Sequence, residues 1–262
     1  MAQQDIIKER RQKISDHIET HGRADTNTLA VVTESTAATI RRDLAYLEQK
    51  GLIIRTHGGA VKSERKKSVW QTSTISSRLE KNYEIKRNIA AFAATLIKDN
   101  ESVMIDGGST TQIFAGYLKE HHNLLVVTNS PGITESLIHN ETARIIQIGG
   151  ELIRDTYQVA GPDAEAHLRR FQVDKSIVSV SGADPNNGCY TAIPIEASLK
   201  RTMIEHAHES ILLVDSSKFD RRALCFAFPF EAIDIVITDS NISKQTAEQI
   251  RKLGVTLHIV DV

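Results

Sequence analysis

The chain has few of the features that would place a protein outside the cell or in a membrane. Its 262 residues include only two cysteines, Cys189 and Cys225, whose wide separation predicts reduced, structural thiols. The start lacks the apolar core of a signal peptide, and no stretch approaches the roughly 18 consecutive apolar residues of a membrane span. These absences favour a cytoplasmic protein with no membrane segment.

Patterns that hold metals or nucleotides are also lacking. The ten histidines are scattered without metal-ligand spacing. His206 and His208 would face different directions on one expected helix, and His121 and His122 fall in an expected solvent-exposed loop. We find neither a Walker loop nor a G-x-G-x-x-G fingerprint. We therefore expect no metal site and no cofactor.

The chain lacks a strong net charge, but the two signs are unevenly distributed. The total is −1, yet Lys and Arg minus Asp and Glu give 13 − 9 = +4 through Trp70 and 19 − 24 = −5 for the remainder. A basic head on an acidic body is typical of a nucleic-acid-binding arm attached to a second domain.

The stretch from Ser35 to Gly51 predicts one amphipathic helix. Ser35 is an N-cap candidate, and Gly51 can end the helix in the left-handed conformation. The apolar residues between them recur at spacings of three and four, which puts them on one buried stripe. The members of this stripe are Ala37, Ile40, Leu44 and Leu47.

The opposite face of this helix carries hydroxyls and arginines, namely Thr36, Thr39, Arg41 and Arg42. Such side chains can meet base edges and phosphates in a DNA major groove, although a solvated helix face is the simpler alternative. Upstream, Asp25 or Thr26 can cap a shorter helix at the spacing of a helix-turn-helix.

Downstream, residues Leu52 to Val61 predict a small β-wing whose glycines permit positive φ. Together with a first helix from Asp5 to about His21, these elements predict a winged helix-turn-helix. The candidate DNA-binding residues are Ser35, Thr36, Thr39, Arg41, Arg42, Arg55 and His57.

The chain divides into three predicted parts. Residues 1–61 form the winged helix-turn-helix, and residues 62–78 are polar, lack a clear period and predict a linker. Residues 79–262 alternate short β-branched runs with amphipathic helices, which predicts an α/β domain on a mainly parallel, Rossmann-like sheet.

Small polar residues follow several of the expected strands, where open α/β sheets bind ligands. The loop from Asp106 to Thr111 can form a phosphate cradle from glycine backbone, hydroxyls and helix amides. Asp215 and Lys218 are a second polar set, and an ordinary ion pair at a strand end explains them equally well. The candidate effector-binding residues are Asp106, Gly107, Gly108, Ser109, Thr110, Thr111, Thr128, Asn129, Ser130, Gly149, Gly150, Asp184, Glu196, Lys200, Asp215 and Lys218.

The run TIRRDLAYLEQKGLIIRTHGGA, Thr39 to Ala60, resembles the N-terminal signature of the DeoR family of bacterial transcriptional regulators. The later motifs DGGSTT, TNS, GGE, E-x-x-x-K and DSSKF follow in the order seen in the sensor domain of that family. The resemblance thus covers nearly the whole chain. It implies a domain similar in fold to ribose-5-phosphate isomerase and glucosamine-6-phosphate deaminase, which binds a phosphorylated sugar or polyol.

The resemblance also implies roles for single residues. The loop from Gly107 to Thr111 would hold phosphate, and Asp215 and Lys218 would contact the ligand. Glu196 and Lys200 match the E-x-x-x-K motif, although their spacing alone predicts only a surface salt bridge. The segment Ser181 to Asp184 is similar to an isomerase loop, but Ser181 stands where that loop has an acid.

The main competing hypothesis is a sugar-phosphate isomerase-like enzyme that carries a DNA-binding module. Asp184 or Glu196 would then shuttle the proton. The missing acid at Ser181 and the attached DNA-reading module argue against turnover, and a purely architectural DNA-binding protein would not need the ligand-like loops. The sequence therefore favours a homo-oligomeric repressor, a dimer or tetramer, that binds double-stranded operator DNA and is released by a phosphorylated sugar or polyol.

Overall fold

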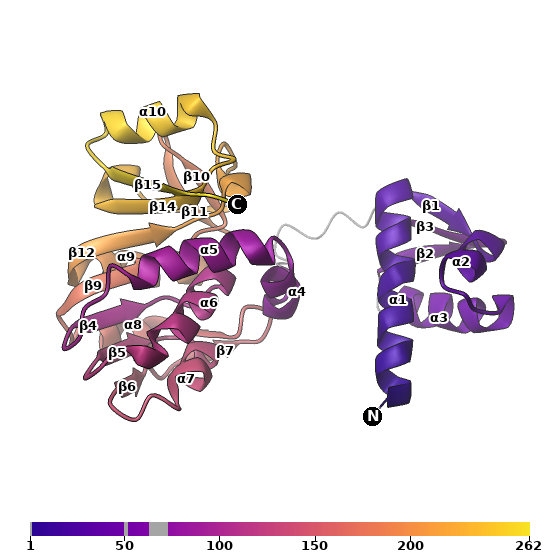
Figure 1. Ribbon diagram of the computed structural model, residues 1–262, viewed down its shortest axis with the longest axis horizontal. Coiled ribbons are helices and arrows are strands. Elements are labelled where there is room, and N and C mark those ends of the chain that lie inside the picture. Colours follow the sequence, from indigo (N-terminus) through magenta and orange to yellow (C-terminus); the bar gives the residue numbers. More distant parts are fainter. Residues whose placement is uncertain (1, 50–51, 63–72) are drawn as a thin grey trace. The chain divides into compact units, whose positions relative to one another are not determined.

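The computed structural model describes residues 2–49, 52–62 and 73–262. Contacts within the chain divide it into two compact units, residues 1–68 and 69–262, each of which is described by itself (Figure 1). Most of the predicted linker, residues 63–72, lies outside the described residues. Within the described ranges, no helix has both the length and the apolar composition that crossing a bilayer requires.

The N-terminal unit packs three helices against a small antiparallel sheet. The helices are α1 (Ala2–His21), α2 (Thr26–Val32) and α3 (Ala37–Gln49), and the strands are β1 (Arg23–Asp25), β2 (Ile53–Thr56) and β3 (Gly59–Lys62), in the order β1-β3-β2. Ile40, Leu44 and Leu47 of the predicted stripe are buried against Ile14 and Ile18 of α1. This is the predicted winged helix-turn-helix, with β1 as an additional strand.

The N-cap of α3 lies one residue later than predicted. The Thr36 hydroxyl accepts a bond from the Thr39 amide at 3.2 Å, and the Thr36 carbonyl accepts the first helical bond, from the Ile40 amide. The Ser35 hydroxyl instead donates to the Thr33 carbonyl in the turn. The prediction of Ser35 as the N-cap was therefore wrong. The predicted cap of α2 by Asp25 is confirmed by its bonds from two amides, whereas Gly51 lies outside the described residues.

A glycine brings the wing close to β1. A Cβ atom on Gly59 would lie 2.1 Å from the Ala24 carbonyl oxygen, so any side chain there would separate β3 from β1. The positive φ predicted for the wing glycines is wrong, since neither Gly58 nor Gly59 adopts it. Close approach of two strands, and not a left-handed turn, requires glycine at position 59.

The C-terminal unit is a three-layer α/β structure on a parallel sheet of seven strands. The strand order is β15-β14-β12-β9-β4-β5-β6. Their bounds are β4 (Ser102–Ile105), β5 (Leu125–Thr128), β6 (Arg144–Gln147), β9 (Val173–Val178), β12 (Ala207–Leu213), β14 (Ile235–Asp239) and β15 (Thr256–Val260). Alternate residues point to opposite faces, so Met104 belongs to one apolar core while Val103 and Ile105 belong to the other.

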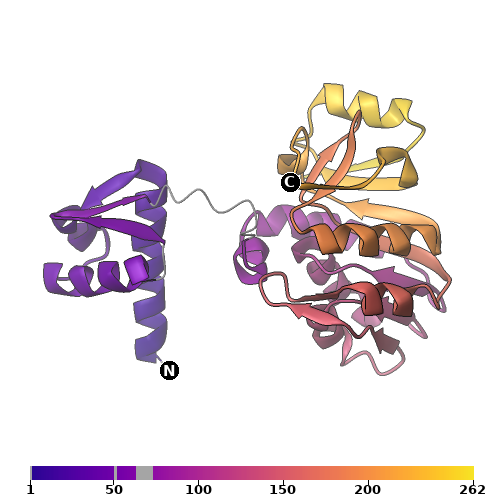
Figure 2. The same cartoon turned by 180° about the vertical axis from the view of Figure 1, so that it is seen from behind.

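Helices cover both faces of this sheet. In Figure 1, α5 (Tyr83–Ala94) and α6 (Ser109–Tyr117) lie in front of it, and α7 (Pro131–Leu137) contributes to the same core. Seen from behind in Figure 2, the other face carries α9 (Pro194–Glu205), which shares its core with α8 (Pro162–Leu168) and α10 (Lys244–Lys252). The predicted alternation of strands and helices is thus confirmed, except that α8 was not predicted.

Smaller elements were also missed. They are the helix α4 (Ile75–Glu80), the hairpin of β7 (Glu151–Ile153) and β8 (Gln158–Ala160), the sheet of β10 (Gly182–Asp184), β11 (Gly188–Thr191) and β13 (Cys225–Phe228), and the 3-10 turns η1 (Leu118–Glu120), η2 (Ser216–Lys218) and η3 (Phe230–Ala232). Helix α4 includes the last residues of the segment that was predicted to be a linker.

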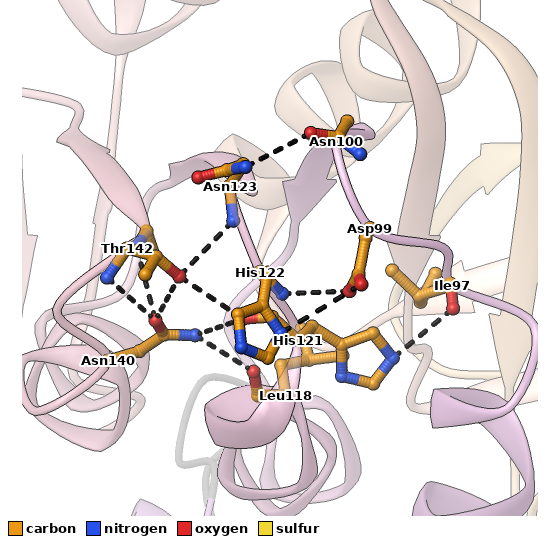
Figure 3. A network of polar contacts seen from close by, with 10 residues as sticks. Ile97, Asp99, Asn100, Leu118, His121, His122, Asn123, Asn140 and Thr142 are labelled. Carbon is orange, nitrogen blue, oxygen red and sulfur yellow. Dashed lines mark hydrogen bonds and ion pairs between the residues drawn. The ribbon is translucent and has the colours of Figure 1, made fainter.

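Polar side chains tie together the loops that enter β4, β5 and β6 (Figure 3). Asn140 donates to the carbonyls of Leu118 and His121, at 3.1 and 2.9 Å. The His121 ring lies 3.2 Å from the Ile97 carbonyl and is half-buried, which corrects the expectation of a fully solvent-exposed loop. His122 is exposed as expected. This network is at the amino ends of the strands and therefore at the opposite edge from the candidate site.

Candidate functional site

The strand order places a topological switch point between β4 and β9. From β4 the sheet continues through β5 to β6, whereas from β9 it continues the other way through β12 to β15. Ligands in open α/β sheets bind outside the carboxyl ends of the strands at such a point. Asp106 follows β4, Asn129 follows β5, Ser179 follows β9 and Asp215 closely follows β12. The sheet therefore brings most of the predicted effector-binding loops to one edge.

Asp106 is a fully buried charged group at this edge. Its Oδ2 atom accepts bonds from Lys200 Nζ at 2.5 Å and from the Ser179 amide at 3.2 Å, while Oδ1 is buried without a partner among the described residues. Burial raises the pKa of the Asp106 carboxyl, and the ammonium of Lys200 opposes that shift. The pair joins α9 to the loop after β4.

Glu196 and Lys200 do not form the surface salt bridge that their spacing suggests. Both side chains are buried, and Lys200 bonds to Asp106. Glu196 Oε2 accepts a bond from the Thr191 hydroxyl at 2.9 Å, and Glu196 Oε1 is buried without a partner in the described part of the chain. The E-x-x-x-K motif therefore places a carboxylate and an ammonium at the edge of the sheet, and the two are not paired with each other.

The glycine loop after β4 is held by protein side chains. The Gly107 amide donates to Asn129 Oδ1 at 2.8 Å, and Asn129 Nδ2 donates to Gln158 and to the Val159 carbonyl. A Cβ atom on Gly107 would lie 2.3 Å from Gln158 Cγ, so glycine is needed for this packing. The Gly107 amide is therefore used within the fold, and phosphate binding by the loop from Gly107 to Thr111 stays a prediction.

Two hydroxyls among the candidate effector-binding residues also form hydrogen bonds within the fold. Thr111 donates to the Gly108 carbonyl at 3.1 Å, and Thr128 donates to the Ile105 carbonyl at 2.7 Å while accepting the Ser130 amide. The N-terminus of α6 differs, because Gly108 cannot supply a side-chain cap. The first-turn amides of α6, at Ser109 and Thr110, are thus left without a side-chain cap.

A cluster of cations lies at this edge and was not predicted as a group. Lys86 of α5 is buried, and its Nζ atom donates to the carbonyls of Arg78 and Lys81. Burial lowers the pKa of Lys86 to about 8, opposed by the carboxylate of Asp215. Burial likewise lowers the pKa of Lys218, again opposed by Asp215. Such shifts are typical of functional sites, although structural ion-pair networks produce them too.

Asp215 and Lys218 are near each other, but they are not a simple ion pair. The Asp215 carboxylate caps the turn η2, accepting the Ser217 amide at 3.2 Å, and also accepts Asn82 Nδ2 at 3.3 Å. No ion pair within 4.0 Å joins Asp215 to Lys218 among the ion pairs of the described residues. Lys218 is therefore held near a carboxylate and keeps its donors for another acceptor.

Two other parts of the prediction have contacts of their own. The Asp184 carboxylate accepts bonds from the Asn186 amide at 3.0 Å and from Asn187 Nδ2 at 2.7 Å, so it stabilises the turn between β10 and β11. The same carboxylate lies 3.6 Å from Arg222 Nη2, and its neighbour Ala183 pairs with Phe219. Gly149 and Gly150 form the exposed bend between β6 and β7.

The predicted DNA-binding residues lie on α3, the turn before it and the wing. Thr36, Arg41, Arg42, Arg55 and His57 are exposed. The remaining two, Ser35 and Thr39, are partly buried. The side chain of Arg55 lies near that of Glu48, with Nη1 3.8 Å from Oε2.

An ion-pair clamp that was not predicted positions α3. Asp43 is buried and accepts bonds from Arg10 Nε at 2.6 Å and Arg11 Nε at 2.7 Å, both from α1. The guanidinium of Arg11 also lies over the Tyr46 ring, 3.7 Å from its centre. Asp43 follows Arg41 and Arg42 in the sequence, so the clamp fixes the helix while these two arginines stay exposed.

Comparison with known protein families decides the identity of the chain. Residues 10–66 match the DeoR-like helix-turn-helix domain, and residues 81–240 match the DeoR C terminal sensor domain. The chain belongs to the DeoR family. The predicted fold class, a winged helix-turn-helix followed by an α/β sensor domain, is thereby confirmed.

Named DeoR-family relatives span nearly the same length. A putative aga operon transcriptional repressor of Escherichia coli O157:H7 is 31% identical over 96% of this chain and 93% of its own. The transcriptional regulator GlpR of Haloferax volcanii is 36% identical over 84% and 85%, and an L-fucose operon activator of Haemophilus influenzae is 34% identical over 84% and 87%. This chain is accordingly a DNA-binding regulator of transcription with a small-molecule sensor domain, and not an enzyme.

Solved structures resemble the chain only distantly. Ribose 5-phosphate isomerase A from Methanocaldococcus jannaschii overlaps with a TM-score of 0.39 and 17% identity, covering 53% of this chain and 55% of that one.

Proposed function

We propose that this DeoR-family regulator represses a sugar or polyol catabolic operon in the cytoplasm and leaves its operator when a phosphorylated intermediate binds. The arrangement of unpaired buried groups at the switch point supports this proposal most directly. Arg78 keeps two buried donors without partners, and Asp106 and Glu196 each keep one buried acceptor, all among the described residues. Buried polar atoms are normally paired, so these are atoms suited to a polar ligand.

The chemistry of those groups favours a phosphate attached to a hydroxyl-rich body. Arg78 is a like charge that lowers the pKa of Lys86 and of Lys218, and its carbonyl accepts a bond from Lys86 Nζ, so the three cations belong to one region of the site. The α6 N-terminus adds amides that lack a side-chain cap. The free oxygens of Asp106 and Glu196 can accept bonds from sugar hydroxyls. A neutral sugar would leave the buried guanidinium of Arg78 without an anionic partner.

The DNA-binding half of the proposal has separate support. Exposed Arg41 and Arg42 on α3 can neutralise phosphates, and Thr36 and Thr39 lie at the start of the same helix, where helix-turn-helix proteins contact bases. One small module offers few base contacts, so we propose a homo-oligomer, a dimer or tetramer, that reads paired half-sites of double-stranded operator DNA. We retain residues 1–61 as the proposed DNA-binding part and residues 79–262 as the proposed effector-binding part. The end of the predicted linker 62–78, which is in α4 and includes Arg78, also contributes to the effector-binding part.

Release requires that the effector binds more tightly to the conformation that fits the operator poorly. Only this difference in affinity can shift the equilibrium. Couplings of roughly 1–3 kcal/mol change operator occupancy about 5- to 150-fold.

The test is a thermal-unfolding screen with sugar and polyol monophosphates and their unphosphorylated parents, followed by operator-release measurements with each compound that stabilises the protein. A ligand at 100 times its dissociation constant adds about 2.7 kcal/mol to the free energy of unfolding. We expect stabilisation by a phosphorylated compound and release of operator DNA by that compound. Stabilisation by unphosphorylated compounds alone would refute the phosphate part of the proposal, and binding without release would refute its role as an inducer.

A further inference from the structure

Arg78 of α4 has a side chain that the rest of the protein leaves unsatisfied. Its Nε and Nη2 atoms are both buried, and neither has a hydrogen-bond partner among the residues that the structure describes. Leaving a charged donor buried without an acceptor is costly, and more so than for a neutral group. The position of Arg78 was predicted to be a linker, so its burial at the candidate site was not expected from the sequence.

The two unsatisfied atoms lie on one edge of the guanidinium. In arginine, the hydrogen on Nε and one hydrogen on Nη2 point in parallel from the same side of the planar group. This edge matches two oxygens of a phosphate or carboxylate, which it can bind with two parallel hydrogen bonds. A lone hydroxyl oxygen would satisfy only one of the two atoms.

Charged residues from other parts of the sensor unit surround Arg78. Burial lowers the pKa of Arg78, and the carboxylates of Glu196 and Asp106 oppose that shift. Neither carboxylate forms an ion pair with Arg78 within 4.0 Å in the described part of the chain, and Asp106 is already paired with Lys200. Arg78 is in turn a like charge that lowers the pKa values of Lys86 and Lys218. An anion at the guanidinium would relieve this repulsion.

The backbone of α4 is fixed to the same cluster. The Arg78 carbonyl accepts a bond from Lys86 Nζ, and α4 packs against α6, whose N-terminus follows the Gly107–Gly108 loop. The amide of Ile75, the first residue of α4, donates to the Asp155 carbonyl at 2.8 Å. Arg78 is thus held by contacts that do not use its guanidinium.

We propose that Arg78 binds the phosphate of the effector through Nε and Nη2. This inference rests on the proposed function and assigns an additional ligand-binding residue to it. The phosphate then bridges α4 to the carboxyl edge of the sheet. Helix α4 is the first helix described after residues 63–72, so effector binding directly involves the chain segment that follows the DNA-binding half.

The experiment compares Arg78→Lys with a matched control, Arg87→Lys. Lysine keeps the charge but loses the two-donor edge, and Arg87 is an exposed residue of α5 that pairs with Glu84 at 2.9 Å. Dissociation constants are measured for inorganic phosphate, for the most stabilising sugar or polyol monophosphate of the screen and for its unphosphorylated parent. We expect Arg78→Lys to weaken binding of both phosphate-containing compounds about 10- to 100-fold, with the parent and the control variant unchanged.

The possible failures are distinguishable. If the wild-type protein binds the monophosphate and Arg78→Lys binds it equally well, the role of Arg78 is refuted while the proposed function stands. Equal weakening of the monophosphate and its parent would also refute it, because Arg78 would then act on the site as a whole. If the wild-type protein binds neither phosphate nor any monophosphate, the proposed function and this inference fail together.

A measurement on the wild-type protein keeps the proposal testable if Arg78→Lys does not fold. Hydrogen exchange of the α4 amides is followed with and without the monophosphate, with the unphosphorylated parent as the control. We expect the monophosphate to slow exchange in α4 and the parent not to do so. Unchanged exchange in α4 with the monophosphate bound would refute a contact with Arg78.

Discussion

Lys200 Nζ lies 2.5 Å from Asp106 Oδ2, and both side chains are buried at the switch point of the sheet. The bond joins residues from α9 and from the loop after β4, so it fixes the relative position of two elements that carry candidate ligand groups. Removing one partner of a buried pair is costly, because the other charge is left buried and unpaired.

We expect Lys200→Met to lower the free energy of unfolding by about 3–5 kcal/mol near neutral pH. Without the ammonium, the pKa of Asp106 rises further above its ordinary value of 3.8. A carboxyl whose folded pKa exceeds its unfolded pKa stabilises the fold at low pH, and this contribution is lost as pH rises through the folded pKa. The loss of stability should therefore be larger at pH 8 than at pH 5 in urea unfolding.

The control for this prediction is the double variant Asp106→Asn, Lys200→Met, which removes both charges. We expect its loss of stability to be smaller than that of Lys200→Met and to be equal at the two pH values. A loss in Lys200→Met that does not depend on pH would show that poorer packing, and not the unpaired carboxylate, determines the effect.

Gly107 allows a direct test of the glycine loop. A Cβ atom there would lie 2.3 Å from Gln158 Cγ, so Gly107→Ala should overpack the site and lower the free energy of unfolding by about 1–3 kcal/mol. Gly116 of α6 is the matched control, since a Cβ atom there meets nothing within 4 Å and alanine should stabilise the helix by about 0.5–1 kcal/mol. Chemical denaturation measures the free energy of unfolding of both variants. Equal effects of the two substitutions would contradict the tight packing of Gln158 on the loop.

Effector affinity should depend on pH through Lys86, whose pKa is lowered to about 8. Below that pH the ammonium is present in the free protein. Above it, binding of an anion requires uptake of a proton, so affinity should fall by up to about tenfold per pH unit. A phosphate ester has its second pKa near 6, so the ligand charge is constant in this range.

Isothermal titration from pH 7 to pH 10 measures this dependence, with Lys86→Gln for comparison. Asp215, Lys218, Arg78 and Lys81 also act on Lys86, and Lys218 with its lowered pKa adds a change of the same sign. We expect a shallower decline in Lys86→Gln than in the wild-type protein. Constant wild-type affinity through pH 10 would exclude a charge requirement at Lys86.

The sequence predicted those parts of the fold that depend on local pattern. The alternation of strands and helices was predicted, and the loop after β4 was predicted as a ligand site, because β-branched runs and glycines are local signals. Lys200 and Asp106 are 94 positions apart, so their pairing is a property of the tertiary fold. Arg78, with two buried guanidinium atoms, and the buried Lys86 belong to residue types that usually lie on surfaces, and no local pattern marks their positions.

Short elements were missed for related reasons. The hairpin of β7 and β8 and the strands β10, β11 and β13 are three or four residues long and form separate small sheets, outside the alternation of strands and helices that marks the main sheet. The cap of α3 was misplaced because Ser35 and Thr36 are both good N-caps, and only the observed Thr39-to-Thr36 bond distinguishes them.

Arg41 and Arg42 should contribute to the salt dependence of operator binding. Replacing both with alanine should weaken operator binding and reduce the slope of log affinity against log salt by roughly 0.9 for each DNA phosphate that the protein no longer neutralises. Effector affinity should not change. The measurement is a series of fluorescence-anisotropy titrations at several salt concentrations. The control replaces Arg169 and Arg170, another adjacent pair of exposed arginines in the sensor unit, with alanine. Retained operator affinity in the first variant would refute the assignment.

Lys218 should separate DNA binding from release. Its pKa is lowered by burial, and no ion pair within 4.0 Å engages it among the described residues, so it is available to an anionic ligand. We expect Lys218→Met to bind operator with unchanged affinity and to bind the phosphorylated effector at least about tenfold more weakly, because a charge-assisted hydrogen bond is removed. Operator release is then measured as a function of effector concentration, with Lys244→Met on the exposed surface of α10 as the control. If the Lys218→Met variant leaves the operator at the same effector concentration as the wild-type protein, Lys218 only supports the turn η2. The phosphate would then have to be held by Arg78 and the amides of α6.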